Sequence, residues 1–247
     1  MAQAVHPFFD PAQVAAFDEL TPKKDSTFEL TYFGLHGFGS TIRVILVLSG
    51  AKFTNKVPAD WPSEKPLAPF GVMPLLKETS ADGKTTINIC ESDAIERYLA
   101  KKFGLVGDNA FEENIINSYV NNTNALMMYI FLAYYRLKDR DPALRAEVKE
   151  ELAGPFAVWA NLNEKHLVAN GSNGHFVGNK LTLADIKAAY VLGIVQSIRE
   201  NDVTEESHPA LWKVKNTVDS IPSYKAWRET EEYQGFSKTN FAVLAYY

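Results

Sequence analysis

The sequence predicts a small α/β domain with a mixed four-stranded sheet, followed by an all-helical domain. Between residues 28 and 104, alternating β-branched segments and helical patterns give the order β-α-β and then β-β-α. After "GLVGDN" the pattern changes, and residues 109–247 contain long helical segments and no convincing strand. The boundary is therefore expected near 104–109, and residues 1–27 are interpreted as an N-terminal extension.

Residues that favour the ends of helices and strands bound the expected elements of the first domain. "TFELTYFG" alternates and is aromatic, which indicates a strand, and "STIRVILVLSGA" indicates a helix with Ser40 or Thr41 as its cap and a glycine at its end. "KFTNKVP", "GVMPLLKE" and "TTINI" are the other expected strands, and "ADGK" is a hairpin turn before the last of them. A helix closes the domain at Gly104. In the extension, Asp10 and Pro11 are expected to begin a short helix.

The second domain is a succession of helical segments. Asp141 is expected as a cap with Pro142 at the first helical position. Thr182 and Asp185 have the spacing of a capping box, with Asp in place of the usual Glu or Gln. The expected helices cover residues 112–139, 141–154, 155–170, 181–200, 208–220 and 221–233.

Composition excludes several classes of function. The 247 residues carry a net charge of −5, which argues against a nucleic-acid surface, and a single cysteine excludes an internal disulfide and a cysteine-rich metal site. The five histidines lack ligand spacing, so no metal is expected. No apolar run reaches the length of a membrane span, and the first residues lack the regions of a secretory signal. We expect a soluble, cytoplasmic protein that does not insert into membranes.

Two local features point to a ligand. Pro74 lies in an expected strand, where proline cannot donate to the ladder, so it belongs at an edge or forms a cis bond that presents the backbone of Met73 to an extended peptide. Seventeen residues later, Glu91-Ser92-Asp93 opens a helix. Ser92 or Asp93 can be a simple cap, or the helix N-terminus can receive an anion. Together the two features would hold a peptide backbone and a carboxylate.

Several segments resemble the glutathione transferases. These are "LTYFGLHGFGSTIRVIL", "ADWPSEKPLAPFGVMPLL", "CESDAIERYLAKKFGLVG", "LTLADIKAAY" and "HPALWKVKNTVDSIPSYKAW". The resemblance is to the sigma-like class, which includes glutathione-dependent prostaglandin D synthases, and it covers about residues 28–230. It implies a thioredoxin-like domain at 28–104, an all-α domain at 109–247 that lines a hydrophobic acceptor site, and a homodimer. It also implies glutathione as co-substrate or cofactor, with a hydrophobic small molecule as partner.

The resemblance assigns roles to individual residues. Tyr32 matches the tyrosine whose hydroxyl hydrogen-bonds the glutathione sulfur, and such a donor favours the nucleophilic thiolate. Trp61 and Lys65 match the pair that holds the glycyl end, and Glu91 and Ser92 the pair that takes the γ-glutamyl amine and carboxylate. The remaining matches are Gly71, Val72, Met73 and Pro74 for backbone contacts, and Leu35, Phe38, Met127 and Phe131 for the hydrophobic acceptor site.

The chain also departs from the family pattern. Phe38 stands where sigma-type enzymes usually have an arginine near the thiol, which leaves Ser40 as an alternative donor to Tyr32. Asn121, Asn122 and Asn124 stand where related enzymes have acidic residues, one of which reaches the glutathione of the neighbouring subunit. Two further residues are expected to have no catalytic role. Cys90 is interpreted as a small buried hydrophobe, and His36 as a surface residue of the glycine turn.

Three functions fit these residues. The first is a transferase that activates the glutathione thiol for addition to a hydrophobic electrophile. The second is a glutathione-dependent isomerase, in which the thiolate adds reversibly to a conjugated alkene and then leaves. The third is a non-enzymatic glutathione-binding module. The first two need the same thiolate, so the sequence does not separate them.

Overall fold

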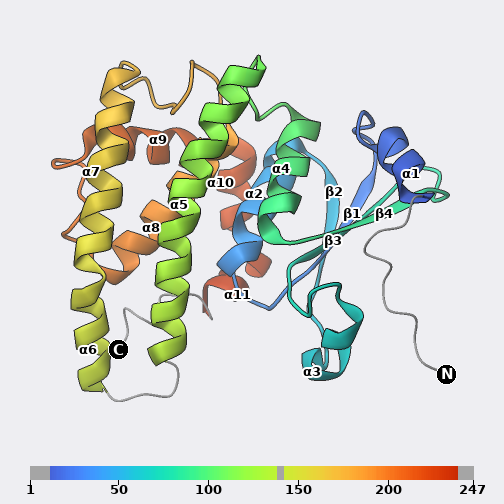
Figure 1. Cartoon of the computed structure of the whole chain (residues 1–247), viewed down its shortest axis with the longest axis horizontal. Coiled ribbons are helices and arrows are strands. Elements are labelled where there is room, and N and C mark those ends of the chain that lie inside the picture. Colours follow the sequence, from blue (N-terminus) through green and yellow to red (C-terminus); the bar gives the residue numbers. More distant parts are fainter. Residues whose placement is uncertain (1–11, 138–141, 239–247) are drawn as a thin grey trace. The chain divides into compact units, whose positions relative to one another are not determined.

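A computed structural model describes residues 12–137 and 142–238 of the chain. The chain forms two compact units, Met1–Phe103 and Gly104–Tyr247. Figure 1 shows the strands in the first unit and the long helices in the second. The first unit contains strands with a hydrophobic period of two together with helices, and the second contains helices with a period of 3.6, as the sequence pattern predicts.

The N-terminal unit is a mixed four-stranded sheet with flanking helices. The strand order is β2-β1-β3-β4, with β1 parallel to β2 and antiparallel to β3, and β3 antiparallel to β4. This confirms the predicted fold class. In chain order the elements are α1 (Ala12–Leu20), β1 (Thr27–Thr31), the short 3-10 helix η1 (Gly37–Gly39), α2 (Ser40–Ser49), β2 (Lys52–Lys56), α3 (Trp61–Glu64), η2 (Lys65–Leu67), β3 (Leu75–Thr79), β4 (Thr86–Cys90) and α4 (Ser92–Phe103).

Side-chain alternation fixes which face of this sheet is buried. Phe28 and Leu30 of β1 are buried, as are Leu76 of β3 and Ile87 of β4, whereas Lys77 of β3 is exposed. The rings of Phe28 and Phe103 meet edge to face at 6.1 Å, so the buried face packs on α4. Helix α4 begins at Ser92, two residues after the end of β4 at Cys90.

The second unit contains only helices among residues 104–137 and 142–238. They are α5 (Ala110–Leu137), α6 (Pro142–Glu151), α7 (Ala153–Ala169), α8 (Leu183–Ile198), α9 (Pro209–Asp219), α10 (Pro222–Arg228) and α11 (Glu231–Lys238). Helices α5 and α7 run alongside each other in Figure 1, and the Trp159 indole donates to the Thr123 hydroxyl between them at 3.2 Å. Twelve of the 16 residues of α8 are buried, which makes this helix the centre of the unit.

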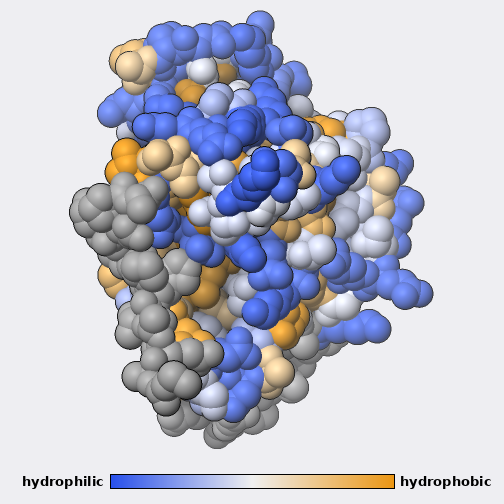
Figure 2. Space-filling model, turned by 90° about the vertical axis from the view of Figure 1, so that its right-hand side faces the viewer, coloured by the Kyte–Doolittle hydropathy of each residue, from blue (hydrophilic) through white to orange (hydrophobic). Residues whose placement is uncertain are grey.

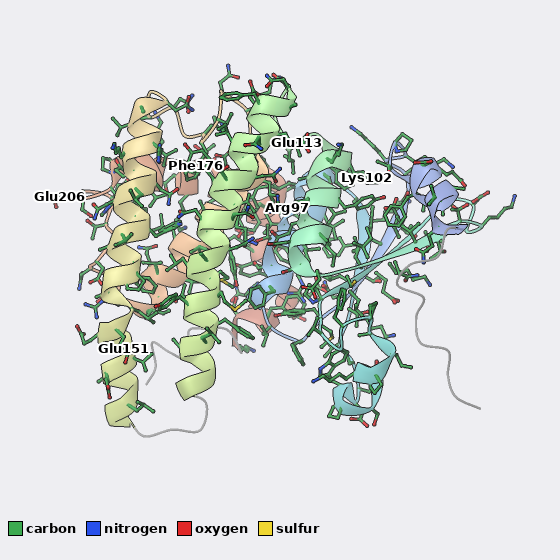
Figure 3. All side chains as sticks on the ribbon, in the orientation of Figure 1. Arg97, Lys102, Glu113, Glu151, Phe176 and Glu206 are labelled. Carbon is green, nitrogen blue, oxygen red and sulfur yellow. The ribbon has the colours of Figure 1, made fainter. Side chains whose placement is uncertain are left out.

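Two carboxylates cap helices in this unit. The predicted capping box is confirmed: the backbone N–H of Thr182 donates to the Asp185 carboxylate at 2.7 Å. The other oxygen of Asp185 accepts the backbone N–H of Phe176, the residue labelled in Figure 3. Glu164 of α7 accepts the N–H groups of Ala210 and Leu211 at the start of α9. These bonds satisfy helix N-termini with groups of the chain itself.

Several local predictions are wrong. Gly39 occupies the N-cap position of α2, and Ser40 and Thr41 are its buried first residues, so neither is the cap. Strand β3 begins after Pro74 and does not contain it. The segment expected as one helix at 221–233 is divided at Glu229 and Thr230 into α10 and α11.

Two further differences concern unexpected helices and segments outside the described residues. Helices α3 and η2 carry Pro62 and Pro66 in their first turns, where proline is tolerated, and were not expected. The starts predicted at Asp10-Pro11 and Asp141 lie outside the described residues.

The surface of the described chain is mainly polar on the side that Figure 2 presents, with small hydrophobic patches between the hydrophilic residues. Within residues 12–137 and 142–238, no helix combines the length and hydrophobicity that crossing a membrane requires.

Candidate active site

The register of the sheet gathers three distant sequence segments at one end. Thr31 of β1 pairs with Leu75 of β3, and Leu75 pairs with Cys90 of β4. Tyr32, Pro74 and Glu91 are the next residues beyond this row. Adjacent strands are about 4.8 Å apart, so the row from Thr31 to Cys90 spans about 10 Å, close to the reach of an extended tripeptide.

The middle of this row is the proline turn. The Met73–Pro74 peptide bond is cis, as predicted. Pro74 is buried, whereas Val72 is 43% exposed. Gly71 has a φ of 63° and donates its N–H to the Ala68 carbonyl at 3.0 Å, which closes the turn before the strand. The backbone of residues 71–73 therefore enters the sheet at its end through a tight turn, which suits a peptide that adds there.

Trp61 and Lys65 lie next to this turn. The Trp61 ring meets the Phe33 ring edge to face at 6.3 Å. A Cβ placed on Gly71 would come within 3.3 Å of the Lys65 side-chain carbon Cε, so the lysine stem lies directly over this glycine. Phe33 follows Tyr32 in the chain. The structure thus brings Trp61, Lys65 and Gly71 together with the segment that carries Tyr32.

The third part of the row is the start of α4. Glu91 has a φ of 71°, a left-handed conformation that is unfavourable for a residue with a side chain. Its carbonyl accepts the N–H of Ile95 at 3.0 Å, so Glu91 holds the N-cap position. Ser92 and Asp93 already lie inside the helix, which contradicts the interpretation of either residue as the cap. The backbone outlier falls on a predicted ligand-binding residue.

Cys90 is 8% exposed at the end of β4. Burial raises the pKa of its thiol, and the neighbouring Glu91 charge adds to the rise. The side chain is therefore a protonated thiol at neutral pH, which agrees with its interpretation as a small buried hydrophobe.

Tyr32 directly follows β1 and is 3% exposed. Its hydroxyl oxygen accepts the backbone N–H of Phe38 at 3.0 Å. A Cβ on Gly37 would lie 2.7 Å from this oxygen, and a Cβ on Gly39 would lie 2.7 Å from the ring. The glycine turn thus wraps closely around Tyr32, and only residues without a side chain fit at these two positions.

One prediction for this turn is wrong. His36 is 2% exposed, so it is not a surface residue. Its carbonyl accepts a bond from the buried guanidinium of Arg43 at 3.4 Å, as part of a turn folded back onto α2. Leu35 and Phe38 are partly exposed, and Ser40 is buried at the start of α2.

Arg43 of α2 bonds this turn, although the family resemblance assigns it no role. A detectable signal exists, since Arg43 is the one charged residue in the apolar helix "STIRVILVLS", which predicts a buried cation.

The residues assigned from the second unit all belong to α5. Met127 is 2% exposed and Phe131 is partly exposed, while the adjacent Met128 is 47% exposed. Asn122 accepts a bond from Asn163 at 3.2 Å, which joins α5 to α7. Asn121 is exposed and Asn124 partly exposed. Among the described residues, no group of three or more His, Cys, Asp or Glu side chains could hold a metal ion.

These features define a class of protein. A thioredoxin-like sheet with a cis-proline before its third strand, joined to a helical unit, is the architecture of a glutathione transferase. Residues 126–231 match the family model described as "Glutathione S-transferase, C-terminal domain".

Named relatives agree. The chain is 32% identical over 203 residues to glutathione S-transferase 1 of Ascaris suum, covering 81% of this chain and 94% of that protein. It is 29% identical to the hematopoietic prostaglandin D synthase of Gallus gallus, with the same coverage of 81% and 94%. The structure of the glutathione S-transferase from Ascaris lumbricoides matches with a TM-score of 0.71 and 30% identity, over 84% of this chain and 100% of that chain. The chain belongs to the glutathione S-transferase family and is a transferase.

Proposed function

We propose that the enzyme activates the thiol of glutathione for addition to a hydrophobic electrophile, with Tyr32 as the catalytic residue. The observation that carries this proposal is the row formed by Thr31, Leu75 and Cys90, because Tyr32, the cis-proline turn and the start of α4 all follow it. In this proposal the N-terminal unit binds glutathione. The predicted residues for the hydrophobic acceptor are Met127 and Phe131 in the helical unit and Leu35 and Phe38 in the N-terminal unit.

The proposed chemistry depends on a hydrogen bond to sulfur. A free thiol has a pKa of about 8.5, so a minor fraction is ionised at neutral pH. A hydroxyl that donates to the sulfur favours the thiolate and lowers that pKa. The thiol proton leaves to solvent, the thiolate forms the new S–C bond, and the acceptor releases its leaving group or takes up a proton. Binding both reactants in one site supplies the proximity.

The rest of the row would hold glutathione in place. Glu91 pairs with the γ-glutamyl ammonium, and the Ser92 hydroxyl with the N-terminus of α4 binds its carboxylate. The backbone of residues 71–73 pairs with the peptide, in the manner of an added strand. Lys65 faces the glycyl carboxylate, and Trp61 packs beside it. The left-handed Glu91 supports this arrangement, because backbone outliers cluster at ligand-binding positions.

Replacing Tyr32 by Phe tests the proposal. The variant should keep glutathione affinity within a few-fold, raise the thiol pKa of the enzyme–glutathione complex and slow conjugation of a chloronitroarene. Tyr119→Phe in α5, where Tyr119 packs on Phe176, is the matched control and should leave all three unchanged. If Tyr32→Phe keeps the full rate and Ser40→Ala removes it, Ser40 is the donor. If both variants keep the full rate, neither hydroxyl activates the thiol.

Isomerisation is the second candidate. A match to the structure of "prostaglandin synthase D of Nilaparvata lugens" supports it, with a TM-score of 0.68 and 28% identity over 83% of this chain. An isomerase regenerates glutathione at each turnover, whereas a transferase consumes it. Measuring free thiol during turnover of a conjugated hydrophobic substrate separates the two, since only conjugation lowers the thiol concentration.

We also propose a homodimer. Helices α5 and α7 carry exposed large hydrophobic residues, which are favoured at interfaces. They include Tyr129 at 62%, Leu132 at 57% and Val158 at 61% exposure. Light scattering that gives the mass of one chain at micromolar concentration would contradict this proposal.

A further inference from the structure

Arg43 is a buried cation beside Tyr32. It is 0% exposed and lies in the first turn of α2. Its Nε donates to the Asn55 side-chain oxygen of β2 at 2.7 Å. Its Nη1 donates to the carbonyls of Leu35 at 2.7 Å and His36 at 3.4 Å, and its Nη2 to the carbonyl of Phe33 at 3.4 Å. One guanidinium therefore holds three carbonyls of the segment that leaves Tyr32.

This segment determines where the Phe38 N–H points. It runs from Phe33 to His36 and leads into η1, whose central residue Phe38 donates its N–H to the Tyr32 hydroxyl at 3.0 Å. Because Arg43 bonds the carbonyls before η1, it sets the path of the backbone that delivers this N–H. The planar fork of a guanidinium suits this task, because it presents several donors in fixed directions.

Arg43 lies beside the Tyr32 ring, and the Phe38 N–H bonds the Tyr32 hydroxyl. The Arg43 guanidinium carbon lies 5.8 Å from the centre of the Tyr32 ring. A guanidinium is always charged in proteins. At this buried position its positive charge stabilises negative charge that develops on the phenol oxygen when the O–H donates. The Phe38 N–H bonds the phenol oxygen and does not use the phenol proton. Hydrogen bonds in such a chain strengthen one another, so accepting this bond makes the O–H a better donor.

We propose that Arg43, acting through Tyr32 and the Phe38 N–H, supplies the positive field for thiolate formation that the side chain at position 38 does not supply. Arg43 is a positioning residue in this proposal, because it touches the tyrosine and its turn. The inference rests on the proposed role of Tyr32 as the donor to sulfur. It explains how a phenylalanine at position 38 is compatible with catalysis: position 38 contributes its backbone, and the cation comes from α2.

A double-mutant cycle between Arg43 and Tyr32 tests the proposal. Arg43→Gln should raise the thiol pKa of the enzyme–glutathione complex, followed by thiolate absorbance, and lower kcat about tenfold, the scale of one hydrogen bond to a charged group. Glutathione affinity should stay within a few-fold, and Arg43→Lys should restore part of the effect. In the Tyr32→Phe background, Arg43→Gln should change neither quantity further, because the two residues act on the same hydrogen bond.

Matched variants separate the electrostatic effect from a loss of structure. Arg199→Gln removes another arginine, which bonds the Lys149 carbonyl in the helical unit, and should leave the thiol pKa unchanged. Asn55→Asp keeps the acceptor for Arg43 and all the packing, but places a negative charge against the guanidinium, so it should raise the thiol pKa. His36 is a titratable residue of the same turn, so the titrations are repeated with His36→Gln to separate its ionisation from that of the thiol.

The outcomes distinguish this proposal from the one it rests on. If Tyr32→Phe itself leaves the thiol pKa unchanged, Tyr32 is not the donor and the proposed function is wrong in that respect. If Tyr32→Phe raises the pKa but Arg43→Gln does not, or if Arg43→Gln has an equal effect in both backgrounds, the Arg43 proposal is overturned. If Arg43→Gln does not fold, Asn55→Asp decides, and an unchanged thiol pKa in that variant overturns the proposal.

Discussion

The two ends of the N-terminal unit each contain a buried cation, and their surroundings differ. At one end, Lys102 of α4, labelled in Figure 3, forms an ion pair of 2.8 Å with Glu78, and both side chains are 0% exposed. At the other end, Arg43 donates to an amide oxygen and to backbone carbonyls. Both cations bond backbone carbonyls and lie beside a tyrosine ring, and the first also meets the charge of a carboxylate. Burial alone therefore does not reveal what a charged residue does.

The Lys102 end is a closed structural cluster. Lys102 also donates to the carbonyl of Leu20, the last residue of α1, at 2.5 Å. The Tyr98 hydroxyl donates to the second oxygen of Glu78 at 2.6 Å, and the Phe17 ring of α1 packs on Tyr98. The cluster ties the helix of the N-terminal extension to β3 and α4. Its bonds join elements of the fold, so we expect its loss to affect stability.

The other end is arranged around backbone conformations suited to a ligand. It contains the cis bond before Pro74, the left-handed Glu91 and the close glycine turn around Tyr32. Helix α4 connects the two ends, because it begins at Ser92 and carries Lys102 in its last turn. Its 12 residues span about 18 Å. Changes at the two ends should therefore separate into effects on stability and effects on glutathione.

The largest expected effect is at Lys102. Lys102→Met leaves Glu78 as an uncompensated buried charge, and breaking such a pair costs about 3–5 kcal/mol of the free energy of unfolding. Chemical denaturation measures this loss. The double variant Lys102→Met with Glu78→Leu should recover most of it, since an apolar pair of similar volume is often neutral. At temperatures where each variant is folded, kcat and the thiol pKa should match the wild type. A raised thiol pKa in the folded variant would show that the two ends are coupled.

The next effect is at Ser92, at the other end of the N-terminal unit, where we expect glutathione affinity to change and stability to stay the same. In the proposed site Ser92→Ala would remove a hydrogen bond to the γ-glutamyl carboxylate of glutathione. Losing such a bond costs about 1.5–3 kcal/mol, or roughly tenfold or more in affinity by calorimetry. The free energy of unfolding should change little, because Glu91 rather than Ser92 holds the N-cap position. Ser118→Ala on the exposed face of α5 is the control. Equal affinity in both variants would remove Ser92 from the proposed site.

The smallest effect concerns alkaline stability at the Lys102 end. Burial raises the pKa of Tyr98, and its hydrogen bond to the Glu78 carboxylate raises it further. Above pH 10 the unfolded chain loses this proton and the folded chain keeps it, so the free energy of unfolding falls as pH rises, by about 1.4 kcal/mol per pH unit. Tyr98→Phe should lose that part of the slope, as judged by urea denaturation between pH 9 and about 11. Parallel stability curves for variant and wild type would contradict this assignment.

Local signals in the sequence predicted much of this site. The strand patterns, the proline at 74 and the polar start of α4 were all recognisable. The cis bond was expected because Pro74 follows an apolar run at the position that the family resemblance gives it. The burial of individual side chains was predicted less well. His36 looked like a surface residue because it lies in a glycine turn, yet the turn folds inward onto Arg43. Ser40 looked like a cap, yet Gly39 precedes the helix and the serine is buried.

By itself, the sequence determined the elements and their order, because hydrophobic period, glycine stops and caps act within a few residues of the chain. It also determined the family, through motifs whose residues are neighbours in sequence. Only the tertiary structure decided that Tyr32, Pro74 and Glu91 follow one row of the sheet, since strand register depends on contacts between distant segments. The same is true of Arg43, whose bond partners come from β2 and from the turn before α2. A charge in an apolar helix shows that it is buried, but its role depends on which oxygens the fold places around it.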